Sequence, residues 1–363
     1  MNSATAAPAA TPSDPPPFPW ELEAQGVDVP ASVPLSEIRS GGPPPDGIPP
    51  IDDPVFTDVA AADEWLEARS PVMLFQLGGE TRAYPLAILT FHEIVNDVLD
   101  DTPVVVTYCP LCNSGLVFER TVDGEVLSFG TSGRLWNSNL VMYDRSTRSL
   151  WSQFTGEAIV GERLGTELRR LPMQIVAWEQ VREAGSDVQV LSRETGHQRP
   201  YGQNPYAGYD SADDPFLFDG ETGGPLAQME RVVTTGDAEQ PVAYPLSLLR
   251  GERVVTDRLD GTPVVAWWVP GTASALDDAD IDEGKDVGAT GLFSRRLDGR
   301  LLSFEPQGEA RFRDTQTGST WNVLGRAVEG PLAGEQLERV PHEDTFWFVQ
   351  YAFRPETRVV ESP

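Results

Sequence analysis

The chain contains an internal repeat, and this repeat restricts its possible folds more than any other feature. Several segments recur in the same order in the second half of the chain. The matched pairs are "AYPLAIL" (83–89) with "AYPLSLL" (243–249), "LDDTPVVVTYCP" (99–110) with "LDGTPVVAWWVP" (259–270), "DGEVLSFG" (123–130) with "DGRLLSFE" (298–305), and "DRSTRSLW" (144–151) with "DTQTGSTW" (314–321). Ordered matches of this kind predict a tandem duplication, roughly 57–195 and 229–361.

Each copy has the sequence character of a mainly β (α+β) unit. Segments such as "TPVVVTY" and "NLVMYDR" are short, rich in β-branched and aromatic residues, and bounded by turn-forming residues. Asp123-Gly124 predicts a tight hairpin over 121–126. One helix is expected over 84–99, where Leu86, Leu89, Ile94 and Val98 fall near helical spacing. We therefore expect each copy to be a β-sheet or small barrel with a short helix.

The amino-terminal part differs from the rest, since 14 of the 32 prolines lie before residue 55. Residues 1–39 are expected to form a flexible arm rich in proline and alanine. Residues 40–228 would hold the first copy with its closing segment, and 229–363 a degenerate second copy.

Charge and hydropathy narrow the choice of partners. The formal net charge is −29, with 56 acidic and 27 basic residues, so nucleic acid is not an expected partner. No apolar run is long enough for a transmembrane helix. No signal peptide is visible, but the first 20 residues resemble the spacer that follows a removed signal or lipid anchor. This predicts an extracytoplasmic protein, secreted or lipid-anchored, and leaves the native start and the oligomeric state open.

The duplication separates scaffold from candidate site residues. Where both copies carry the same residue, folding explains it, whereas a reactive residue found in one copy points to a site. The reactive residues gather in the first copy: Cys109 stands opposite Val269, Cys112 opposite Thr272, His92 opposite Glu252, and Glu93 opposite Arg253.

Both cysteines of the chain lie in "TYCPLCNSG", between an apolar strand and a second predicted strand. A thioredoxin-type pair would instead begin a helix, whose positive end stabilises the thiolate. A strand-turn-strand is the setting of a metal knuckle, in which Asn113 would take a positive φ and backbone N–H groups would point at the sulfurs. Redox chemistry, a structural disulfide and inert thiols remain the alternatives.

Two thiolates rarely complete a metal site, so further ligands are expected from elsewhere. His92 is the first choice, His197 the second, and Met142 would complete a sulfur-rich copper set. Glu93 is a candidate ligand, proton acceptor or catalytic base. Taken singly, His92 is more typical of a structural histidine and Met142 of a core residue. The expected cofactor is a transition metal ion, copper or zinc.

Two other function classes compete with metal binding. The pair could act as a metal-free thiol-disulfide oxidoreductase, with Cys109 as attacking thiol and His92 or Glu93 as its base. The chain could also be a non-catalytic module that binds a small molecule or a protein in a pocket walled by Tyr201, Tyr206 and Tyr209. The sequence leaves open whether the protein is an enzyme with a small-molecule substrate.

Several motifs together resemble one known family. They are "SGGPPPDGIPPIDDPVF", "AYPLAIL", "HEIVND", "TYCPLCNSGLVFER", "FGTSG", "NLVMYDRSTRSLWSQFTGEAIVG" and "NPYAGYD". The chain resembles the bacterial and archaeal family named domain of unknown function 3179, from about Ser40 to Tyr209 and more weakly beyond. The resemblance implies an exported protein or lipoprotein whose hallmark residues are His92, Glu93, Cys109 and Cys112. Asn113 departs from the glycine expected at its position.

Overall fold

The computed structural model describes residues 15–185, 187–220, 223–235 and 239–361, and strands dominate it. The first copy forms three sheets in which hydrogen-bonded neighbours are often distant in sequence. Their strand orders are β15 (Met173–Ala177), β3 (Pro71–Leu77), β4 (Glu80–Pro85), β16 (Gln189–Leu191), β2 (Phe56–Thr57); β14 (Arg170–Leu171), β7 (Ser114–Glu119), β6 (Thr102–Cys109), β5 (Ile94–Leu99); and β1 (Arg39–Ser40), β10 (Phe129–Trp136), β11 (Asn139–Asp144), β12 (Leu150–Ser152), β13 (Ala158–Val160).

The second copy repeats this topology. Its sheets have the orders β28 (Glu343–Phe346), β17 (Arg231–Thr234), β18 (Val242–Pro245), β29 (Arg358–Val359); β19 (Val254–Leu259), β20 (Thr262–Val269), β21 (Ala289–Ser294); and β24 (Phe304–Gln307), β25 (Arg311–Asp314), β26 (Thr320–Trp321), β27 (Ala327–Glu329). The duplication and the mainly β class are confirmed, and none of the sheets in the described ranges closes into a barrel.

The helices also occur in pairs. Helix α3 (Leu86–His92) follows β4 as α5 (Leu246–Glu252) follows β18, and α4 (Trp178–Val181) follows β15 as α6 (Trp347–Phe353) follows β28. Outside this pattern lie α1 (Pro19–Ala24) and α2 (Val59–Ala62). None of the helices that the structure describes combines the length and the apolar character needed to traverse a membrane.

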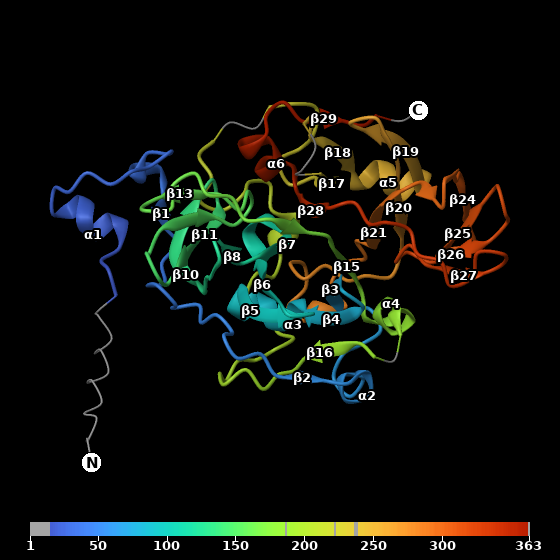
Figure 1. Ribbon diagram of the computed structural model, residues 1–363, viewed down its shortest axis with the longest axis horizontal. Helices are drawn as coiled ribbons and strands as arrows, with labels where there is room; N and C mark the ends of the chain where they lie inside the picture. The colour runs from blue at the N-terminus through green and yellow to red at the C-terminus, as the bar shows by residue number, and fades with distance from the viewer. Residues whose placement is uncertain (1–14, 186, 221–222, 236–238, 362–363) are drawn as a thin grey trace, which may run out of the picture.

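The two copies interlock rather than standing apart (Figure 1). Strand β15 of the first copy contacts β21 of the second, and β28 of the second contacts β7 of the first. The helix ends are exchanged in the same way. Glu183, after α4, pairs with Arg311 on β25, while Phe353 of α6 packs edge-on against Trp136 of β10.

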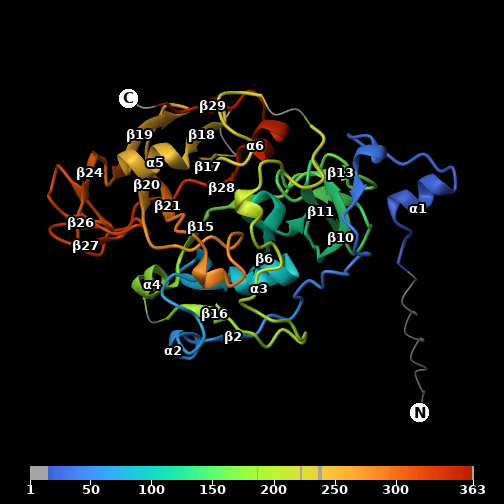
Figure 2. The same cartoon turned by 180° about the vertical axis from the view of Figure 1, so that it is seen from behind.

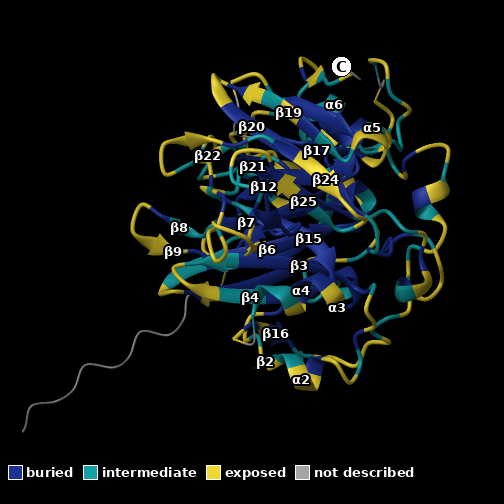
Figure 3. Cartoon of the chain, turned by 90° about the vertical axis from the view of Figure 1, so that its right-hand side faces the viewer, coloured by how far each residue is buried: buried dark blue, intermediate teal, exposed yellow. Residues whose placement is uncertain are grey.

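The buried strands form cores to which both copies contribute (Figure 3). One apolar cluster combines Leu74 and Trp178 of the first copy with Trp267 and Trp321 of the second. A second cluster places Phe346 and Phe348 of the second copy beside the cysteines of the first. Because apolar burial is the main stabilising term, neither copy is expected to fold alone.

The structure confirms the predicted hairpin but shortens the predicted helix. Strands β8 (Thr121–Val122) and β9 (Glu125–Val126) pair across Asp123 and Gly124, which both have positive φ. The helix expected over 84–99 ends at His92, because Glu93 adopts a left-handed conformation with φ 58°. The residues after it form β5, which pairs with β6.

Part of the expected flexible arm is packed against the protein. Residues 1–14 lie outside the described residues, but Phe18 and Ile38 are only 5% and 6% exposed. They join an apolar cluster on the third sheet, where β1 pairs with β10. The proline content indicated flexibility, whereas the apolar residues between the prolines supply enough burial to fix this segment.

Asp144 is a scaffold residue, as its presence in both copies suggested. Its carboxylate accepts hydrogen bonds from Thr147 N at 2.7 Å and Trp151 Nε1 at 3.0 Å. Asp314 makes the corresponding bonds to Thr317 N at 2.6 Å and Trp321 Nε1 at 3.0 Å.

Replacing either aspartate with alanine is expected to lower the free energy of unfolding by about 2–4 kcal/mol, because a buried indole N–H loses its acceptor. Denaturant unfolding of D144A, D314A and the exposed control Asp28→Ala measures this effect. A loss of stability in only one of the variants D144A and D314A would contradict the equivalence of the two turns.

Candidate functional site

The cysteine loop adopts the strand-turn-strand predicted from the sequence. Cys109 is the last residue of β6, Pro110–Cys112 forms a short 3-10 turn, and β7 begins at Ser114. Asn113 has φ 50°, the left-handed conformation expected at this position. Its backbone N–H closes the turn on Pro110 O at 3.1 Å.

Both thiols are free and converge on one backbone carbonyl. The Sγ atoms of Cys109 and Cys112 lie 3.9 Å and 3.5 Å from Ser138 O. The residues are 2% and 0% exposed. Burial, followed by the neighbouring Cys109 thiol, raises the pKa of Cys112 well above its ordinary value, so this thiol is protonated at neutral pH.

A side-chain amide donates to one of the sulfur atoms. Asn139 Nδ2 lies 3.4 Å from Cys112 Sγ and 2.7 Å from Gln153 Oε1. Gln153 Nε2 in turn donates to Thr107 Oγ1 at 2.9 Å and Ser114 O at 3.1 Å. This buried network holds the strands on both sides of the thiols. The predicted backbone donors are not among the sulfur contacts that the described part of the chain shows.

The second copy fills the same place with apolar side chains. In the equivalent ladder, Trp267 stands where the first copy has Thr107, and its Nε1 donates to Val323 O at 3.1 Å. Val323 aligns with Gln153, two residues after the matched tryptophans. Our sequence reasoning missed this network, although the same comparison between copies would have found it.

Glu93 is a buried carboxyl beside the thiols. Its left-handed backbone is shared with Arg253, φ 63°, so the conformation belongs to the scaffold and the carboxyl is particular to the first copy. Burial raises the pKa of Glu93 to about 8, partly offset by the hydrogen bond from Tyr206. The charge of Glu93 also contributes to the raised pKa of Cys112.

His92 faces a different part of the molecule. Its Nδ1 lies 2.6 Å from Pro49 O, so that nitrogen donates, and Nε2 accepts from the Tyr201 hydroxyl at 2.7 Å. Burial lowers its pKa to about 4. The His197 ring lies 5.5 Å from the His92 ring.

The structure thus assembles the predicted ligands as separate groups. Cys109 and Cys112 lie together, with Met142 in the same apolar cluster, and His92 lies with His197. Over the described ranges, no three His, Cys, Asp or Glu side chains form a metal-binding group. The prediction of one set containing Cys109, Cys112 and His92 gains no support from this geometry.

A segment between the copies covers the thiols, and we call residues 203–218 the strap. The Tyr209 hydroxyl donates to Leu111 O at 2.9 Å, and Ser138 Oγ donates to Phe216 O. Asp210 fixes the strap to the second copy through two 3.0 Å bonds from Arg231. Seen from behind, the turn at 209–211 lies over β6 (Figure 2).

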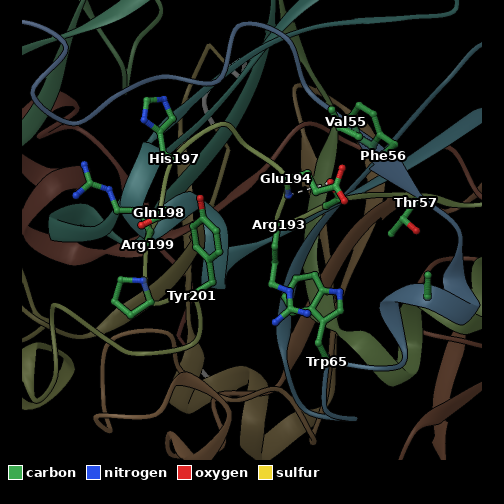
Figure 4. A pocket seen from close by; sticks show the side chains of 13 residues that line it. Val55, Phe56, Thr57, Trp65, Arg193, Glu194, His197, Gln198, Arg199 and Tyr201 are labelled. Carbon is green, nitrogen blue, oxygen red and sulfur yellow. Dashed lines mark hydrogen bonds between the residues drawn. The ribbon is translucent and has the colours of Figure 1, made fainter.

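The three tyrosines predicted to wall one pocket are divided between two places. Tyr206 and Tyr209 belong to the strap and contact the surroundings of the thiols. Tyr201 lines a cleft on the His92 side (Figure 4).

The second copy supports the cysteine loop directly. Thr345 Oγ1 donates to Cys112 O at 2.9 Å, and Asn113 Nδ2 donates to Asp344 O at 3.3 Å. Both partners belong to β28, so the strand that interlocks the copies also fixes the turn that carries the thiols.

Searches among curated proteins and solved structures gave no match. A family model described as "Protein of unknown function (DUF3179)" matches residues 45–357, which covers both copies and the strap. The chain therefore belongs to the DUF3179 family.

Proposed function

We propose that the first copy binds one copper(I) ion through Cys109 and Cys112. The observation that carries this proposal is the convergence of both sulfur atoms on Ser138 O, at 3.9 Å and 3.5 Å, at the tip of a braced turn. Thiols held in this way need little rearrangement to share one ion. The conformational entropy of their side chains is already lost on folding, so ion binding loses little more.

The charge balance around the thiols supports a cation. Three groups that become anionic on losing a proton, the two thiols and the Glu93 carboxyl, are buried close together. None of the ion pairs found in the described residues involves Glu93. Burying unpaired negative charge is costly, and a bound cation would offset that cost when the thiols ionise.

The donor set favours copper(I) over zinc, the other ion that the sequence left open. Structural zinc sites use four ligands, and catalytic zinc sites use three protein ligands. Soft thiolates select copper(I), which accepts two-coordinate sites. Because His92 is hydrogen-bonded to Pro49 O and the Tyr201 hydroxyl, the two sulfur atoms are the ligand atoms that already lie together. Glu93 would act as the buried carboxyl that ionises in response to the cation.

The alternative of thiol-disulfide exchange with partner proteins has less support. A reactive cysteine is a partly exposed thiolate, whereas both residues here are at most 2% exposed and burial raises the pKa of Cys112. An extracytoplasmic location, predicted from the amino-terminal spacer, remains part of the proposal.

Copper(I) titration under anaerobic conditions, in competition with a chromophoric copper(I) chelator, tests the proposal. We expect about one copper per chain for the wild type and none in competition for Cys109→Ser/Cys112→Ser. His92→Gln is the matched control and should retain the ion, because its ring faces away from the thiols. Equal copper binding by the wild type and the double serine variant would refute the site.

A second prediction concerns Glu93. Its folded-state pKa of about 8 lies above the ordinary 4.5, so the folded state holds this proton more tightly. The resulting stabilisation is present below about pH 4.5 and is lost as pH rises toward 8. Glu93→Gln should therefore lie within about 1 kcal/mol of the wild type near pH 5 and be more stable at pH 8, by on the order of a few kcal/mol.

Thermal unfolding of the metal-free proteins between pH 5 and pH 8 measures this difference. Comparing the variant with the wild type cancels the titration of other groups, including His92. Parallel curves for the two proteins would show that Glu93 is not buried as a protonated carboxyl.

A third prediction concerns the strap, which controls access to the thiols. Tyr209→Phe removes the hydrogen bond that the hydroxyl donates to Leu111 O and the longer one, 3.3 Å, that it accepts from Phe216 N, a loss of about 1 kcal/mol. If reagents reach the thiols by local opening of the strap, labelling should become about fivefold faster. Reaction with a chromogenic disulfide reagent under native conditions measures the rate. The Tyr201 hydroxyl faces His92 and not the thiols, so the control variant Tyr201→Phe should label at the wild-type rate. Equal acceleration of labelling by both variants would indicate general loosening of the structure instead.

A further inference from the structure

A second site candidate lies on the other side of His92. It is a cleft of about 910 Å³, within the size range of small-molecule sites. Its walls come from β2 and the residues around α2, and from the segment that follows β16. Figure 4 shows His197, Arg199 and Tyr201 together on one side, and Phe56, Thr57 and Trp65 on the other.

The charge of this cleft is opposite to that of the whole protein. The chain carries a formal charge of −29, yet two arginines, Arg193 and Arg199, and a single carboxylate, Glu194, line the cleft. Within the described ranges neither arginine forms an ion pair with a carboxylate. Arg193 instead lies over the Trp65 ring, 4.9 Å from its centre, which leaves its N–H groups available to a ligand.

Both walls of the cleft are held in position by contacts outside it. The Tyr201 hydroxyl is fixed between His92 Nε2 at 2.7 Å and Thr195 Oγ1 at 2.5 Å. The Phe56 ring is held edge-on against Tyr84, with centroids 5.9 Å apart, and under the Arg82 guanidinium. Such preorganisation reduces the entropy lost when a ligand binds.

We propose that this cleft binds a small organic acid, whose anionic group is attracted by Arg193, Arg199 and His197 and whose flat apolar body lies against Phe56. Arginine suits the anion because its planar fork pairs with carboxylate and phosphate oxygens. The site is distinct from the thiols, since the residues that line it include none from the strap or from the cysteine loop.

Binding of benzoate, phenyl phosphate and the neutral isostere benzamide to the full chain tests the proposal by titration calorimetry. We expect both anions to bind more tightly than benzamide, and the tighter of the two to identify the preferred acidic group. Arg193→Gln and Arg199→Gln should each weaken anion binding by about threefold to fivefold, the effect of one exposed charge pair.

Arg134→Gln is the matched control, because Arg134 also lies over a tryptophan ring, Trp20, at 4.5 Å but outside the cleft. Its binding should equal that of the wild type, as should that of Cys109→Ser/Cys112→Ser. The proposal is overturned if neither anion binds at about 10 mM, if benzamide binds as well as benzoate, or if both cleft variants bind like the wild type.

Discussion

The packing of β15 and β28, the second-to-last strand of each copy, against the other copy is the constraint on which the rest of the structure depends. Strand β15 covers β21, and β28 covers β7, so each copy closes an apolar face that its own strands leave open. Arg170 of β14 and Glu343 of β28 add a buried ion pair across the same boundary. Removal of one partner from such a pair typically costs about 3–5 kcal/mol. The thiol site inherits this dependence, because β28 also holds Cys112 O and Asn113.

Duplication explains why a polar network could develop in one copy. The equivalent position in the second copy is stabilised by Trp267, which stacks on Phe312 with ring centres 4.3 Å apart. There, aromatic packing and one indole hydrogen bond to Val323 O hold the strands. In the first copy, Thr107 and Gln153 take the places of Trp267 and Val323. Their hydrogen bonds, and those of Asn139, must all be satisfied, since an unpaired buried polar group costs about 1–3 kcal/mol. This hydrogen-bond network lies beside the two thiols and reduces apolar packing. It is therefore easier to understand as part of a site than as a means of stabilising the core.

The sequence alone was sufficient for the features that repeat or have strong local signals. The duplication, the strand-rich copies, the Asp123-Gly124 hairpin and the left-handed Asn113 all follow from such signals. The end of α3 was not predictable in this way. Ile94 and Val98 continue the helical spacing in the sequence, but their segment forms a strand because it pairs with β6. Packing of the amino-terminal arm was missed for a similar reason. Its few apolar residues become decisive only when the third sheet is present to receive them.

At the candidate site, too, the local sequence was not sufficient to predict the arrangement of two adjacent residues. His92 and Glu93 are adjacent, and one metal set containing His92 and the cysteines was a reasonable prediction. The positive φ of Glu93 ends the helix between them, so the imidazole bonds to Pro49 and Tyr201 while the carboxyl lies beside Tyr206 and the thiols. Arg253 keeps the same turn in the second copy without either reactive group. The helix end that both copies share therefore points neighbouring side chains in different directions, and in the first copy these two side chains are an imidazole and a carboxyl.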